Sequence, residues 1–251
     1  MFWIEVIAPT PVLNTPDFAA VFGGPSGCTV PLNESGHPLH FEFVALKTMQ
    51  FEVMQEIDPP VYQIRWLDYS AAPLYIDGRF CQRIAAKTDL VNHPLDARAI
   101  LDHMERRVGT PYLWGGNWTP GVPDMLRYYP PKQSLDPRIH RLWTLQGLDC
   151  SGLLFEATNG ATPRNSSQLL RFGAPIPEHA PFKPLDMIVY PGHVLFIRDE
   201  TTTIESRSPI GVYIDSLEKR MAEIHLQRTY TSAWHSGLDA KSHYTLRRFL
   251  A

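Results

Sequence analysis

Short apolar runs separated by turn residues fill the first third of the chain. From Val6 to about Ala86 these runs are interrupted by Pro, Gly, Asn and Asp, as in 28–30, 41–57 and 61–66. Many short strands with frequent turns are typical of a small all-β barrel or sandwich. Near the end of this stretch, Asp77-Gly78 separates two apolar runs, and we expect a tight hairpin turn there because glycine readily adopts positive φ angles.

The hydrophobic period changes after the polar stretch 87–93. Four apolar residues then share one face of a predicted helix: Ile100, Leu101, Met104 and Val108. Gly109 follows where a helix C-cap belongs. We therefore expect a domain boundary near residue 90, with residues 1–90 forming the β-rich domain and residues 91–251 forming a second domain.

The second domain is predicted to open with helices and close with a sheet. A helix is expected to begin at Cys150, because the Asp149 side chain can accept a hydrogen bond from the first turn, and to end at Asn159-Gly160. β-Branched and aromatic residues predict later strands at 187–190, 193–197, 203–205 and 244–250. This order of elements indicates an α+β fold.

Composition narrows the range of partners. The 251 residues carry a formal net charge of −3, and no run of Lys or Arg could hold a nucleic acid or an anionic membrane. No apolar stretch is long enough to span a bilayer, and the N-terminus lacks the basic and apolar regions of a signal peptide. We expect a cytoplasmic protein, or a periplasmic or cell-wall protein if a leader was removed. His37 and His40 lie close together but have no acidic or Cys partner at ligand spacing, so we expect no metal and no cofactor.

Three cysteines, Cys28, Cys81 and Cys150, show no spacing typical of disulfide frameworks or zinc sites. Cys28 and Cys81 are interpreted as small buried hydrophobes. Cys150 differs because a helix N-terminus stabilises a thiolate. His193 follows the turn Pro191-Gly192 at the start of a strand and is the best candidate base, and Glu205 on the next strand could orient its ring. From spacing alone, a buried thiol and a structural histidine remain the default interpretation.

Five motifs in a fixed order raise the odds of catalysis. Together they resemble the NlpC/P60 family of cell-wall cysteine peptidases over roughly residues 95 to 215. The motifs are Pro111-Tyr112-Leu113-Trp114-Gly115-Gly116, Asp149-Cys150-Ser151-Gly152, Thr162-Pro163-Arg164-Asn165-Ser166, Leu185-Asp186-Met187-Ile188-Val189-Tyr190 and Gly192-His193-Val194. The preceding β-rich stretch resembles the bacterial SH3-like domain that often stands before such catalytic domains.

The resemblance implies a papain-like catalytic domain that needs no cofactor. Such enzymes hydrolyse the amide between γ-D-glutamate and a diamino acid, meso-diaminopimelate or lysine, in peptidoglycan stem peptides or murein fragments. By position, Cys150 matches the nucleophile, His193 the base, and Tyr112 the tyrosine that can hydrogen-bond the oxyanion. The positions that match the acyl-side pocket, which meets L-Ala and D-Glu, are Trp114, Asp149, Ser151 and Ser166.

Two departures from the family pattern stand out. Glu205 occupies the third polar position, which is commonly histidine, and its carboxylate would favour a thiolate–imidazolium pair. The Pro-rich, aromatic segment 117–146 separates two motifs that normally follow one another closely, so we expect it to border the cleft, although a surface excursion is the alternative. Two rival functions stay open: an amidase or acyltransferase of the same superfamily, and a non-catalytic protein that binds cell-wall peptides.

Overall fold

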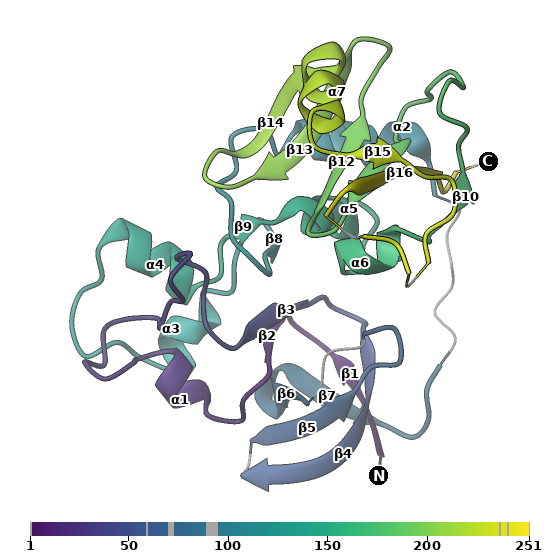
Figure 1. Ribbon diagram of the computed structural model, residues 1–251. Coiled ribbons are helices and arrows are strands. Elements are labelled where there is room, and N and C mark those ends of the chain that lie inside the picture. The colour runs from purple at the N-terminus through teal and green to yellow at the C-terminus, as the bar shows by residue number, and fades with distance from the viewer. Residues whose placement is uncertain are drawn as a thin grey trace. The chain divides into compact units, whose positions relative to one another are not determined.

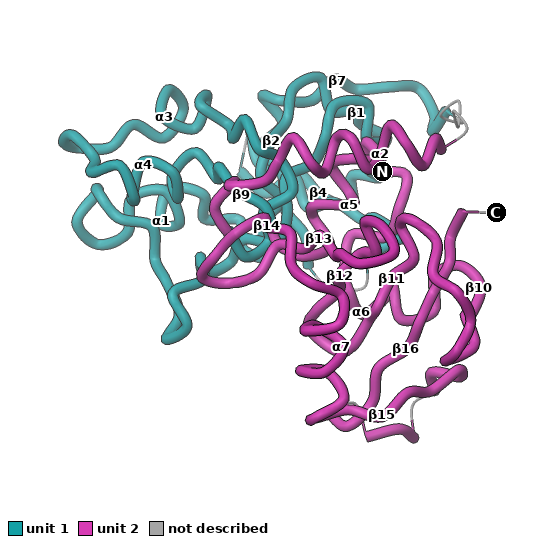
Figure 2. Tube along the Cα trace, turned by 90° about the horizontal axis from the view of Figure 1, so that it is seen from above, with its two compact units in different colours: residues 1–91, 113–148 teal, residues 92–112, 149–251 magenta. Residues whose placement is uncertain are grey.

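The structure is a computed structural model that describes residues 2–58, 60–69, 73–88, 95–235, 237–239 and 241–250. The chain divides into two compact units, each built from two separate stretches of sequence (Figure 2). The first unit comprises residues 1–91 and 113–148, and the second comprises residues 92–112 and 149–251. The predicted boundary near residue 90 lies outside the described residues. The segment 113–148, which that boundary assigned to the second domain, packs within the first unit.

The first unit is built on a seven-stranded antiparallel sheet with the order β3-β2-β6-β5-β4-β1-β7 (Figure 1). In β1 (Phe2–Val6), buried Ile4 and Val6 alternate with the partly buried Glu5, as expected for a strand with one face against a core. The strands are β1 (Phe2–Val6), β2 (Thr10–Leu13), β3 (Phe41–Ala45), β4 (Gln50–Asp58), β5 (Val61–Arg65), β6 (Leu74–Asp77) and β7 (Cys81–Ile84).

β3 and β7 are the two edge strands of this order, and among the described residues no hydrogen-bonded pairing joins them to each other. The β-rich prediction for this part of the chain is confirmed, whereas the closed SH3-like barrel stays a prediction. One short helix, α1 (Phe18–Val21), interrupts the strands, with Asp17 as its N-cap.

The hairpin predicted at Asp77-Gly78 is wrong. A 3₁₀ turn, η1 (Gly78–Phe80), follows β6, and the strands on either side of it pair with different neighbours: β6 with β2 and β5, and β7 with β1. The cause is the fully buried Asp77 carboxylate, which accepts hydrogen bonds from the backbone and the guanidinium of Arg79. This side chain makes a capped helical turn more favourable than a two-residue reversal.

The Pro-rich segment folds into α3 (Asp124–Tyr128), α4 (Pro137–Trp143) and a two-stranded ladder of β8 (Asn117–Trp118) with β9 (Gly147–Leu148). Trp143 is fully buried in a cluster with Phe18 and Phe22 of the same unit. The Asn117 side chain accepts from the backbone N–H of Val44 and donates to its carbonyl, both at 2.8 Å. Within its own unit, this segment is therefore part of a core and not a loose excursion.

The second unit has a sheet with the order β10-β16-β11-β12-β13-β14, and a short strand β15 pairs with β16 (Figure 1). This largely antiparallel sheet is accompanied by helices, as the α+β prediction requires. The strands are β10 (Ala174–Pro175), β11 (Met187–Tyr190), β12 (His193–Ile197), β13 (Thr202–Arg207), β14 (Gly211–Ser216), β15 (Thr229–Tyr230) and β16 (His243–Arg248).

Four helices accompany this sheet: α2 (Ala97–Glu105), α5 (Cys150–Ala157), α6 (Ser166–Leu169) and α7 (Leu217–His225). α5 packs on β12 and β13, whereas α7 packs on β13 and β14. The buried Glu156 of α5 accepts from Arg107 Nε at 2.8 Å and contacts His103 of α2, which ties the two helices together. α2 ends before Val108, so that residue is exposed and not on the buried face predicted for it.

Candidate active site in the second unit

The N-terminus of α5 fixes the position of Cys150. Asp149 is the N-cap, in extended backbone conformation, and its Oδ1 accepts from the backbone N–H of Gly152 at 2.6 Å. The helix then begins at Cys150, which is 6% exposed. A capped helix start holds the thiol at the positive end of the helix dipole, where a thiolate is stabilised. The predicted start of this helix is confirmed.

The β12 strand brings His193 to this thiol. Cys150 Sγ lies 3.9 Å from the carbonyl oxygen of Gly192, the residue directly before His193, and Cys150 is one of the groups that raise the pKa of His193. The turn that precedes β12 includes Gly192 at φ +84°, a backbone conformation that favours glycine. Sequence elements far apart in the chain thus place a thiol and an imidazole together in one unit.

Glu205 completes a line of three side chains. β12 and β13 pair antiparallel, with Phe196 opposite Ile204, so the prediction of two successive strands that carry His193 and Glu205 is confirmed. His193 Nε2 donates to Glu205 Oε2 at 2.5 Å, which leaves the other ring nitrogen for the thiol. Glu205 is fully buried, and a short charge-assisted hydrogen bond of this kind fixes the plane of the ring. The geometry matches a nucleophile, a base and an orienting acceptor.

The sequence did not single out Arg220, which holds the other side of Glu205. Arg220 comes from α7, is 2% exposed, and donates from Nε to Glu205 Oε1 at 2.6 Å and from Nη2 to Oε2 at 3.2 Å. It also pairs with the more exposed Glu223 on the same helix. The signal that points to Arg220 is its place on the apolar face of α7, beside Met221 and Ile224.

The electrostatics of His193 and Glu205 agree with a charged pair. Burial by itself lowers the pKa of His193, but hydrogen bonds with Cys150 and Glu205 prevail and raise that pKa to about 10. Burial would raise the pKa of Glu205, yet His193 and the positive charge of Arg220 lower it. Glu205 is therefore ionised and His193 protonated at neutral pH. A protonated imidazole beside a thiol is the state from which a thiolate acts as nucleophile.

Tyr112 lies near the start of α5. Its pKa is raised, first by burial and then by the negative charges of Asp149 and Cys150. The phenol consequently keeps its proton at neutral pH and can donate a hydrogen bond. This is the property that the predicted oxyanion role requires.

Arg164, which lies in the third sequence motif, contacts both Asp149 and Ser151. The sequence alone assigned no role to it. Its Nη1 and Nη2 donate to Asp149 Oδ1 and Oδ2 at 3.1 and 2.7 Å, and Nη1 also contacts Ser151 Oγ at 3.1 Å. Arg164 is 1% exposed. The charge of Asp149 is therefore shared with a buried guanidinium, and the carboxylate serves first as the helix cap. Contact of Asp149 and Ser151 with substrate stays a prediction.

The two remaining predicted residues, Ser166 and Trp114, belong to different units. Ser166 is the first residue of α6, partly buried, with a capping box formed by Asn165 and Gln168. Trp114 belongs to the first unit, where its ring is 40% exposed and stacks on His37 with 5.9 Å between ring centroids. Their roles in an acyl-side pocket stay predictions.

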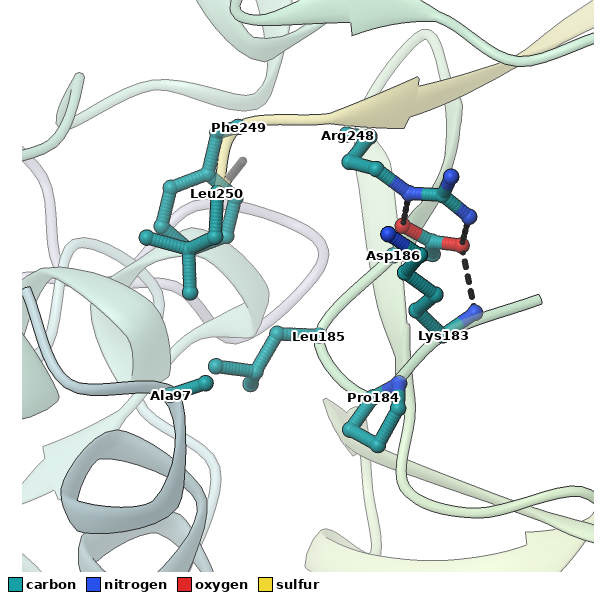
Figure 3. Close-up of a pocket in the computed structure, with 8 residues that line it drawn as sticks. All are labelled: Ala97, Lys183, Pro184, Leu185, Asp186, Arg248, Phe249 and Leu250. Atoms are coloured by element: carbon teal, nitrogen blue, oxygen red, sulfur yellow. Dashed lines mark hydrogen bonds and ion pairs between the residues drawn. The ribbon is translucent and has the colours of Figure 1, made fainter.

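A separate pocket of about 170 Å³ lies in the second unit near the end of β16 (Figure 3). Arg248 and Asp186 form a paired ion bridge at its edge, with Nε–Oδ1 at 2.7 Å and Nη2–Oδ2 at 2.5 Å. The backbone N–H of Lys183 donates to the same carboxylate at 2.7 Å. Leu185, Phe249 and other apolar groups line the rest. The residues that line this pocket do not include any of the predicted site residues.

Comparison with known proteins gives structural likenesses but no sequence match. No family model matches the chain, and no curated protein matches it. In the described part of the chain, no helix is long and apolar enough to cross a bilayer.

Three solved structures show the kind of likeness found. An NlpC/P60 family protein from Bacillus cereus is 16% identical, with a TM-score of 0.40, over 99% of this chain and 63% of that one. RipD from Mycobacterium tuberculosis, a non-catalytic NlpC/P60 domain protein adapted to peptidoglycan binding, is 19% identical, with a TM-score of 0.37, over 63% and 100%. RipB from the same organism, a peptidoglycan hydrolase, is 19% identical, with a TM-score of 0.35, over 67% and 75%.

This chain thus spans 63% of the length of the Bacillus cereus protein. With TM-scores below 0.5, these likenesses decide neither the fold nor the activity.

Proposed function

We propose that the chain is a cysteine peptidase of the NlpC/P60 type, which hydrolyses the amide between γ-D-glutamate and a diamino acid in peptidoglycan stem peptides or murein fragments. The observation that carries this proposal is the position of His193, which follows Gly192, the residue that Cys150 Sγ contacts, and which is hydrogen-bonded to the buried Glu205 at 2.5 Å. The five ordered motifs support the choice of substrate, and an SH3-like role for the β-rich stretch belongs to the same proposal.

The first half of the reaction forms an acyl-enzyme. The Cys150 thiolate attacks the carbonyl carbon of the γ-D-glutamyl amide, and the carbonyl electrons move to oxygen. The phenolic hydroxyl of Tyr112 donates a hydrogen bond to that oxyanion and keeps its proton. When the intermediate collapses, the C–N bond breaks and protonated His193 gives its proton to the leaving amine, so the diamino acid departs neutral at nitrogen. The product on the enzyme is a thioester.

The second half regenerates the thiolate and the protonated imidazole. Neutral His193 takes a proton from water, the hydroxide attacks the thioester carbon, and the C–S bond breaks to leave the Cys150 thiolate and a γ-carboxylic acid, which loses its proton to solvent. Throughout, Glu205 holds the imidazole plane and stabilises its positive charge without taking its proton, because its pKa is lowered by His193 and Arg220.

The test uses the full chain and the tripeptide L-Ala-γ-D-Glu-meso-diaminopimelate, with products identified by mass. We expect release of diaminopimelate by the wild type and none by Cys150→Ala, with the fold checked by circular dichroism. Cys28→Ala is the matched control, because it removes a thiol from the other unit. Equal rates for wild type and Cys150→Ala would refute the proposal.

The same experiment separates the rival functions. Binding of the tripeptide without turnover would identify a non-catalytic protein that binds cell-wall peptides. Acyl transfer to an added amine, with no free acid formed, would identify an acyltransferase. Neither outcome is compatible with the proposed peptidase.

A further inference from the structure

Arg228 and His193 both lie beside the ring of Tyr190. Arg228 follows α7 in the second unit and is partly buried. Its guanidinium carbon lies 4.1 Å from the centroid of the Tyr190 ring. The Tyr190 ring in turn lies 5.4 Å, centroid to centroid, from the ring of His193. The guanidinium and the imidazole thus share one aromatic neighbour.

Within the described residues, Arg228 has no acidic partner. Its Nη1 donates to the neutral amide oxygen of Gln227 at 3.2 Å, and its buried Nε has no hydrogen-bond partner there. Three other guanidiniums of the unit each meet a carboxylate: Arg164 with Asp149, Arg220 with Glu205, and Arg248 with Asp186. A cation held in place by a ring but not neutralised is a suitable binding group for an anion.

We propose that Arg228 is a subsite for a carboxylate of the leaving diamino acid residue. This inference rests on the proposed function, because it uses the position of the scissile bond. His193 must reach the leaving nitrogen to protonate it, so that nitrogen lies beside the imidazole. The carbon that carries this nitrogen also carries a carboxyl group, which is free when the diamino acid is the last residue of the peptide. The flank of His193 that Tyr190 and Arg228 occupy is where such a group can meet a guanidinium.

The chemistry of the pair favours this ligand. A guanidinium binds a carboxylate through two parallel N–H···O hydrogen bonds. Stacking on Tyr190 fixes the plane of Arg228 before the substrate arrives, so little side-chain entropy is lost on binding. The subsite would favour tripeptides that end in the diamino acid over longer stem peptides, in which the same carboxyl group is an amide. Arg228 would then determine specificity and take no part in proton transfer.

Three peptides test the subsite: L-Ala-γ-D-Glu-meso-diaminopimelate, the same peptide with the carboxyl next to the scissile nitrogen converted to an amide, and the lysine tripeptide. We expect Arg228→Gln to lower kcat/KM for the first peptide roughly 10- to 100-fold, the range for a hydrogen bond to a charged group. We expect the amide peptide to be a poor substrate for the wild type and to be unaffected by Arg228→Gln. Arg228→Lys should restore part of the loss.

Arg106→Gln is the matched control, because Arg106 is an exposed arginine of the same unit at the end of α2. A different pattern would identify the distal carboxylate of diaminopimelate as the group that Arg228 binds. In that case Arg228→Gln would leave kcat/KM for the lysine peptide unchanged but lower it for the amide peptide, and the subsite would stand. An equal loss for all three peptides, or no loss, would overturn it. Failure of the wild type to cleave any of them would instead refute the proposed function.

Discussion

Arg220 Nε lies 2.6 Å from Glu205 Oε1, and both residues are almost completely buried. A carboxylate removed from water would normally take up a proton, and the neighbouring guanidinium prevents this. Glu205 can therefore present a full negative charge to His193. The pair links α7, a helix that the sequence pattern did not predict, to the side chain that hydrogen-bonds His193.

Replacing either member of this pair should reduce turnover. We expect Glu205→Gln to lower kcat by roughly 10²- to 10⁴-fold, the range for positioned acid–base groups. Arg220→Met should lower kcat by about 10- to 100-fold, as is typical when the residue that orients a functional histidine is disturbed. Steady-state kinetics across pH 5 to 9 measure both effects. Glu223→Gln is the control, because it removes the other partner of Arg220 and leaves Glu205 in place; an equal loss there would contradict the assignment.

The protonation state of His193 can be read by NMR. Because its pKa is raised to about 10, its ring resonances should not titrate between pH 6 and 8.5. In Cys150→Ala the pKa should fall, because the hydrogen bond with Cys150 is the largest contribution that raises it and burial continues to lower it. A midpoint near 6.5 in the wild type would show that the imidazole is neutral in the resting site.

The same shift predicts how stability depends on pH. The pKa of His193 is higher in the folded state than the ordinary value of 6.5, so its protonation stabilises the fold fully below pH 6.5. This contribution should disappear as the pH rises through about 10. We expect the difference in free energy of unfolding between wild type and His193→Gln to shrink between pH 6.5 and 10.5 in urea titrations. A difference independent of pH would contradict the charged pair.

Alkylation should distinguish the three thiols. Burial, with the charge of Asp77, raises the pKa of Cys81 to about 12, so this thiol should stay unreactive at mildly acidic pH. We expect iodoacetamide at pH 6 to label Cys150 before Cys28 and Cys81, measured by peptide mass. His193→Gln should slow labelling of Cys150 and leave Cys28 unchanged. Equal labelling of all three thiols would argue against an activated nucleophile.

The buried ion pair at the start of α5 should be important for stability. Arg164→Met leaves the Asp149 carboxylate buried without its cation, which typically costs about 3–5 kcal/mol. The double variant Asp149→Asn/Arg164→Met should recover part of that loss, because no charge is then left unpaired. Urea unfolding measures both. A loss below about 1 kcal/mol for Arg164→Met would place this pair with exposed ion pairs of little net effect.

Short-range sequence patterns predicted those parts of the site that depend on neighbouring residues. Asp149 caps the helix that begins at Cys150, and the apolar runs around His193 and Glu205 form two successive strands, as expected. These outcomes depend on capping, alternation and turn chemistry within a few residues. The active-site roles of these residues remain proposals that the experiments above address.

Longer-range features escaped prediction for physical reasons. Arg220 reaches Glu205 only because α7 packs on β13, a contact between elements that no sequence spacing reveals. The expected turn at Asp77-Gly78 failed because the buried Asp77 carboxylate is used to cap a 3₁₀ turn. The sequence did not show that the segment 117–146 contributes to a core through the buried Trp143, because its partners Phe18 and Phe22 lie far away in the chain; that it borders the cleft stays a prediction.

The chain leaves the second unit at Tyr112 and re-enters it at Asp149, directly before Cys150. Both covalent junctions of segment 113–148 thus adjoin predicted catalytic residues. A change in the backbone at either end of that segment therefore falls directly beside one of these two residues, so each junction is a place where a substitution in the first unit is expected to affect the second.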